Sequence, residues 1–82
     1  MNHNRQCIVI ARAEALFASF VPTGAPLTPA EAHEAVAQAV RSRGGIRRCA
    51  AEMAAVFGDS PDAAVARMRW ALGIITEQAP PR

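Results

Sequence analysis

Four arginines that fall within eight positions are the residues in this chain best placed to do chemistry. They are Arg41, Arg43, Arg47 and Arg48, on either side of the pair Gly44-Gly45. A guanidinium binds phosphate through a fork of donors that lysine lacks, and the exposed amides at a helix start bind anions. Because a cation at a helix start is disfavoured by roughly 0.3–1 kcal/mol, the cluster predicts a phosphate-contacting corner. The alternative is a solvated basic turn that pairs with Glu52.

The segment from Cys49 to Trp70 has the outline of a helix-turn-helix, in which the second helix enters a DNA groove. The residues that fit the motif are Ala54 at the helix contact, Gly58 in the turn, and Val65, Met68 and Leu72 on the second helix. Arg67 and Arg69 lie on that helix and would approach the nucleic acid together with the cluster. A helical hairpin without DNA binding gives the same pattern, and Asp59 and Asp62 stand where base-reading groups are expected.

The last helix is also apolar on a second side. With Val65, Met68, Leu72 and Ile75 facing inward, Trp70 projects from the opposite side together with Ala63, Ala66 and Ile74. A helix that is apolar on two sides is either fully buried or presents one side to a partner. Tryptophan flanked by arginine is typical of the energetic centre of a protein interface. The pattern predicts a partner surface at these residues, and the alternative is that Trp70 packs under the first helix or the tail.

Other reactive side chains are few and scattered. His3 lies near the N-terminus, His33 lies at the edge of an apolar stripe, and Cys7 and Cys49 show no ligand spacing. No nucleophile motif, pair of carboxylates or glycine-rich phosphate loop occurs. The sequence therefore predicts a protein that is not an enzyme, with no metal, no cofactor and no small-molecule substrate.

The elements that must position these residues are four helices, expected at about 5–20, 29–43, 46–57 and 60–76, with a flexible tail at 77–82. Thr28-Pro29-Ala30-Glu31 is the strongest local signal, because threonine, proline and glutamate at these positions form a capping box. Gly58 is expected to end the third helix in a left-handed cap. Ser60-Pro61 then begins the fourth.

The first helix is expected to be amphipathic. Val9, Ala13, Leu16 and Phe20 form one stripe, which Ile10 and Phe17 widen, and Arg12, Ala15 and Ser19 lie opposite. Nineteen alanines and few β-branched or aromatic residues indicate an all-α fold with a core of small side chains. One compact domain is predicted, in which the last three helices form a helix-turn-helix-like trihelical unit. The first helix either caps that unit or helps to build a dimer.

Charge, apolar runs and cysteine content indicate the partners and the compartment expected for the chain. The formal charge of +2 is too small to indicate nucleic acid by itself, although all nine basic residues are arginine. The apolar run at 7–11 is interrupted by Arg12 and Glu14, so it predicts neither a signal peptide nor a membrane span. Two cysteines without a partner pattern are expected to be reduced thiols in a cytoplasmic protein.

Four short segments resemble a group of small helical actinobacterial proteins of Streptomyces type. They are Ala15–Ser19, Cys49–Glu52, Phe57–Asp59 and Ala64–Ala71, and the run Ala-Arg-Met-Arg-Trp-Ala within the last is the most specific. The resemblance covers most of residues 12–71. It implies a soluble helical protein of actinobacterial origin and carries no activity with it.

The sequence therefore supports two functional hypotheses. The first is a non-enzymatic regulatory module that binds DNA through the helix-turn-helix-like unit, with Arg41, Arg43, Arg47, Arg48, Arg67 and Arg69 on the phosphate backbone. The second is a module for protein interaction or homodimerisation that uses Ala63, Ala66, Trp70 and Ile74. The exposure of Trp70 and Arg67 in the folded chain distinguishes between the two hypotheses.

Overall fold

The computed structural model describes residues 3–77, and these form four helices and no strand. They are α1 (His3–Phe17), α2 (Pro29–Arg43), α3 (Ile46–Asp59) and α4 (Pro61–Glu77). The all-α prediction is confirmed. Of the predicted tail 77–82, Glu77 belongs to α4 and the rest lies outside the described residues.

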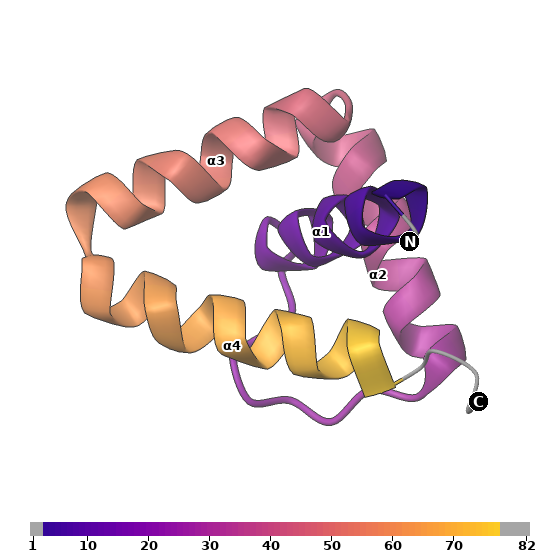
Figure 1. The fold of residues 1–82 in the computed structure, drawn as a ribbon. Coiled ribbons are helices and arrows are strands. Elements are labelled where there is room, and N and C mark those ends of the chain that lie inside the picture. The colour runs from indigo at the N-terminus through magenta and orange to yellow at the C-terminus, as the bar shows by residue number, and fades with distance from the viewer. Residues whose placement is uncertain (1–2, 78–82) are drawn as a thin grey trace.

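The first helix lies at the centre of the molecule. In Figure 1, α3 and α4 diverge from their shared turn, and α1 lies between them with α2 alongside. α1 contacts each of the other three helices, whereas α2 and α4 barely touch. The last three helices thus do not close a core without α1, and their helix-turn-helix-like arrangement stays a prediction.

Two clusters of small side chains build the core, and α1 contributes to both. One joins α1, α2 and α4 through Ala13, Leu16, Ala32, Ala35, Ala71, Ile74 and Ile75. The other joins α1, α2 and α3 through Ala15, Ala18, Ala39 and Cys49. Most of these residues are alanine, and small side chains at a contact allow helices to approach closely.

Burial of α1 differs from the predicted stripe. Its second half is covered on all sides, so Ala15 and Ser19, expected to face away from the core, are buried. Phe20 is 72% exposed and Ile10 is 53% exposed, although both were expected to face inward. The prediction failed at Ser19 and Phe20 because α1 ends at Phe17, so these two residues do not continue its helical stripe.

α1 also ends three residues earlier than the sequence predicts. The Ser19 hydroxyl donates to the carbonyl of Leu16 at 2.6 Å and accepts from the amide of Val21 at 3.2 Å. These bonds replace the next helical turn, because serine competes with helix formation through its own hydroxyl.

Local capping signals set the bounds of α2. The Thr28 hydroxyl accepts from the amide of Glu31 at 3.1 Å, and the Glu31 carboxylate accepts from the amide of Thr28 at 2.8 Å. At the other end Gly44 adopts a left-handed conformation with φ of 92°, and its amide donates to the carbonyl of Val40. Both ends of α2 lie where the sequence predicts them.

The end of α3 is set by a proline rather than by a glycine. Gly58 is helical and has no positive φ, so the predicted left-handed cap at this residue is wrong. The helix continues to Asp59 and breaks at Ser60, which has φ of −143° and ψ of 74°. Ser60 precedes Pro61, and the ring of a proline disfavours helical geometry in the residue before it.

Candidate interaction surface

Arg67 of α4 holds the C-terminal end of α1. Its Nε donates to the carbonyl of Phe17 at 2.8 Å, and one terminal nitrogen donates to the carbonyl of Ser19 at 2.9 Å. The other terminal nitrogen donates to the Thr23 hydroxyl at 2.9 Å. The guanidinium also lies over the Phe17 ring and over the Trp70 ring. Burial lowers the pKa of Arg67 from its ordinary value.

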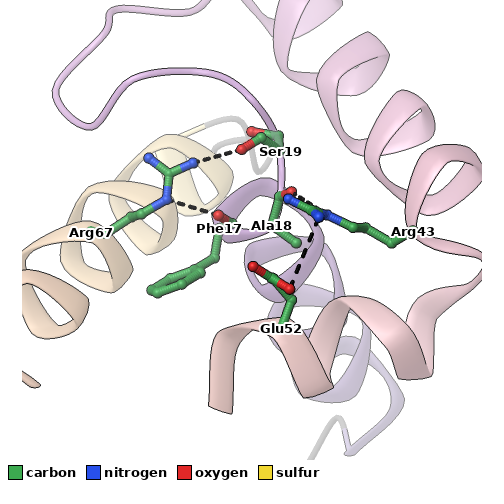
Figure 2. A network of polar contacts seen from close by, with 6 residues as sticks. All are labelled: Phe17, Ala18, Ser19, Arg43, Glu52 and Arg67. Atoms are coloured by element: carbon green, nitrogen blue, oxygen red, sulfur yellow. Dashed lines mark hydrogen bonds and ion pairs between the residues drawn. The ribbon is translucent and has the colours of Figure 1, made fainter. Parts of the chain in front are cut away.

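Arg43 of α2 reaches the same end of α1 from the other side (Figure 2). Its Nε donates to the carbonyl of Ala18 at 3.1 Å, and its guanidinium lies 3.9 Å from the Glu52 carboxylate. The same group is 5.4 Å from the centre of the Phe20 ring. Arg43 therefore links α1, α2 and α3.

These two arginines act as a cap for α1. The last carbonyls of a helix have no partner within it and carry a partial negative charge, so cationic donors satisfy them well. Arg43 and Arg67, both predicted to contact phosphate, are half-buried and donate to the protein's own carbonyls. A phosphate contact by these two arginines stays a prediction, and it would have to compete with these hydrogen bonds.

Trp70 is also turned inward. Its indole N–H donates to the carbonyl of Ala25 at 2.9 Å, which fastens the connection between α1 and α2 against α4. Ile74 is only 9% exposed and belongs to the core. The predicted outward face that combined both residues with Ala63 and Ala66 is therefore wrong for Trp70 and Ile74, and only the two alanines are exposed.

The inner face of α4 is rotated relative to the prediction because Arg67 and Trp70 pack on the preceding connection. The buried residues are Ala64, Ala71, Ile74 and Ile75. Val65, expected inside, is 41% exposed. Ala54, which the helix-turn-helix interpretation places at the helix contact, is exposed as well. Met68 and Leu72 pack against the core as the motif requires, so the helix-turn-helix interpretation stays a prediction.

The other predicted phosphate contacts remain on the surface. Arg47 and Arg48 are exposed in the first turn of α3, and Gly45, the N-cap, provides no side-chain hydrogen bond. Arg41, at the end of α2, is exposed and lies 3.4 Å from the Glu34 carboxylate. Arg48 lies against Gly44 of the turn between α2 and α3, whereas Arg41 pairs back along α2. Arg69 is exposed on α4, apart from them.

α3 presents a surface that sequence reasoning missed. Cys49 is its only fully buried residue among fourteen, which makes α3 the least covered of the helices. Between Arg48 and Asp59 the exposed residues are Ala51, Ala54, Ala55 and Gly58, and the one charged residue, Glu52, is half-buried and lies 3.9 Å from Arg43. We refer to these four exposed residues as the outer face of α3. Their spacing of three and four on the side opposite Cys49 was the signal available in the sequence.

Residues suited to acid–base or metal chemistry are not gathered. Within residues 3–77, no three histidine, cysteine or acidic side chains lie close enough to hold a metal ion. His33 and Cys7 are exposed on different helices. An apolar depression of about 420 Å³ beside the start of α1 is lined by Arg5, Gln6, Val9 and Ile10. None of these four is a nucleophile or a general base at neutral pH.

Comparison with protein families, with curated proteins and with solved structures found no match to this chain. Across the described part of the chain, no helix has both the length and the apolar character needed to cross a bilayer.

Proposed function

We propose that this chain is a non-enzymatic protein-interaction module that binds its partner through the outer face of α3. The observation that supports the proposal is the exposed surface that Ala51, Ala54, Ala55 and Gly58 form on α3. A helix on the surface of a globular protein normally carries charged or polar residues toward solvent, and one that is apolar on two sides presents one of them to a partner.

The residues that compete for this role are occupied elsewhere. Trp70 is bonded to Ala25, and Arg67 covers part of its ring. The exposed alanines of α4, Ala63 and Ala66, are accompanied on that helix by exposed Arg69 and Asp62. α3 is the helix with the fewest fully buried residues, although the larger exposed side chains Ile8 and Ile10 lie near the start of α1.

Photo-crosslinking from single exposed alanines tests the proposal. Benzoylphenylalanine replaces Ala54 on α3, Ala66 on α4 or Ala30 on α2, each in the full chain produced in its native cells. We expect Ala54 to give one discrete protein adduct, identified by mass spectrometry, and Ala30 to give none. An adduct from Ala66 but not from Ala54 moves the binding surface to α4, and adducts no more discrete than those of Ala30 reject the proposal.

A second candidate function is supported by the basic turn between α2 and α3. Arg47 and Arg48 are exposed and form no ion pair within the described residues, and a helix start with free amides favours anions. With Arg41 they offer three contacts to the phosphate backbone of DNA.

Salt dependence tests this second candidate. Three phosphate contacts imply a logarithmic slope of about −2.7, so that affinity falls roughly 40-fold between 50 and 200 mM salt. Fluorescence anisotropy of a labelled duplex measures this fall, and Arg47→Ala should reduce the slope by about one. An absence of binding at 50 mM salt rejects the candidate.

A further inference from the structure

The charges at the two ends of α3 are opposite to those that its own dipole favours. Arg47 and Arg48 occupy the first turn, where negative charge is preferred, and Asp59 is the last residue, where positive charge is preferred. α2 has the favourable arrangement, with Glu31 in its first turn and Arg41 and Arg43 in its last. α1 also carries Arg5 in its first turn and Glu14 in its last, but Arg43 and Arg67 cap its end. α3 is the helix in which the inversion is combined with an uncovered face.

A second copy of α3 in antiparallel orientation would neutralise this inversion. In such a pair the start of each helix lies beside the end of the other, so the arginines of one copy meet the aspartate of the second. A two-fold axis makes the arrangement the same for both copies. The surface between the charged ends is Ala51, Ala54, Ala55 and Gly58, which allows two helices to approach closely.

The spacing of the charges defines the register of the pair. Arg48 and Asp59 are separated by 59 − 48 = 11 positions, which is about three helical turns at 3.6 residues per turn. They therefore lie on the same flank of α3, one at each end. An antiparallel pair brings the same flank of both copies together, and the axis then passes between Met53 and Ala54.

We propose that the chain forms a homodimer in which the outer faces of two α3 helices pack antiparallel, with Arg48 of each copy beside Asp59 of the other. The inference rests on the proposed function, since it names the occupant of the same face. Figure 1 shows α3 along one edge of the molecule, which leaves the full length of this helix available.

Charge reversal tests the register. Sedimentation velocity over a range of concentrations compares wild type with Arg48→Asp, Asp59→Arg and the double variant that carries both changes. Each single reversal brings like charges together at both ends of the pair, so we expect the dimer dissociation constant to rise roughly tenfold. The double variant restores opposite charges and should return to within about threefold of wild type.

The same variants provide a control for folding. Both reversals improve the charge arrangement of α3 with respect to its own dipole, so thermal stability at concentrations below dimer formation should not fall. Arg69→Asp and Glu77→Arg make equivalent changes of charge on α4 and should leave the dissociation constant unchanged. Ala54→Glu places two carboxylates close to the axis and should give a monomer.

Several outcomes overturn the homodimer. The proposal is rejected if wild type sediments as a monomer at every concentration. It is also rejected if the double variant dimerises as weakly as the single reversals. If wild type is monomeric but Ala54 crosslinks to a different protein, the proposed function stands and the homodimer is rejected. If Ala54 gives no adduct, both are rejected.

Discussion

Arg67 and Arg43 determine how α1 ends, because the carbonyls after its last turn receive their donors from α4 and α2 rather than from nearby residues. A guanidinium presents several N–H groups in one plane and therefore satisfies two carbonyls and a hydroxyl at once. Lysine offers a single ammonium group and lacks this fork. At position 67, arginine is thus structurally necessary, and lysine could not fully replace it.

Replacement of Arg67 should destabilise the fold. Arg67→Ala removes three hydrogen bonds and leaves the partly buried carbonyls of Phe17 and Ser19 without these donors. We expect the free energy of unfolding to fall by about 2–4 kcal/mol, and Arg67→Lys should recover only part of it. Arg69→Ala, an exposed neighbour on the same helix, should change it by less than about 0.5 kcal/mol. Urea denaturation measures all three, and equal effects at both positions would contradict the capping role.

At the scale of helices, the boundary between α3 and α4 depends on Pro61 rather than on Gly58. A glycine ends a helix only where the chain needs a positive φ, as at Gly44 with φ of 92°. Gly58 is in regular helix and is surrounded by open space. It therefore weakens α3 without providing a turn.

Alanine at the two glycines should have opposite effects. Gly58→Ala should stabilise the protein by about 0.5 kcal/mol, because alanine restricts the unfolded chain and suits a helix. Gly44→Ala should destabilise it by about 1 kcal/mol, since a side chain at positive φ is strained. Thermal denaturation at low protein concentration reports both. A loss of stability with Gly58→Ala would indicate that this residue turns the chain after all.

At the scale of the whole molecule, the core depends on α1, which belongs to both hydrophobic clusters. Cys49 lies in the second cluster, at the meeting of α1, α2 and α3, and is fully buried. Burial raises the pKa of its thiol, Arg43 opposes this effect and Glu14 adds to it. Cys7 is exposed near the start of α1.

The two thiols should report different events. Cys7 should react with a disulfide reagent at once in the native protein, whereas Cys49 should react only after the helices around it separate. The half-time of the slow phase should shorten as urea lowers the free energy of unfolding. Two fast phases in native buffer would contradict the packing of Cys49.

The pKa of Cys49 also predicts a loss of stability at alkaline pH. The pKa of the Cys49 thiol is higher in the folded chain than in the unfolded chain. The contribution of this thiol to the free energy of unfolding therefore keeps its full value below about pH 8.5. Above that pH the unfolded thiol loses its proton while the folded thiol keeps it, and the free energy of unfolding falls. In Cys49→Ala the free energy of unfolding should lack this part of its decrease between pH 8 and 10. In Cys7→Ala the decrease should remain.

Features with a local cause could be predicted from the sequence. The capping box at Thr28 and Glu31 and the glycine at 44 fixed both ends of α2, since each depends on residues within one turn. The all-α class followed from alanine content. The position of the break between α3 and α4 was predicted within two residues, although Gly58 was given the role that belongs to Pro61.

Features that depend on distant contacts could not be predicted. Arg67 contacts Phe17, fifty positions earlier, and Trp70 contacts Ala25, forty-five positions earlier. A helical wheel shows which residues share a face but not which neighbour covers that face. For this reason the sequence predicted phosphate contacts for the arginines and a partner surface at the tryptophan, and it did not indicate the uncovered side of α3.

The capping of α1 has a consequence for synthesis of the chain. α1 leaves the ribosome before the other three helices, and the donors for its terminal carbonyls follow 25 and 50 positions later. Its central place in both clusters adds to the delay, because its neighbours are also still to be made. We expect stalled nascent chains to become protease-resistant only when Arg67 has emerged.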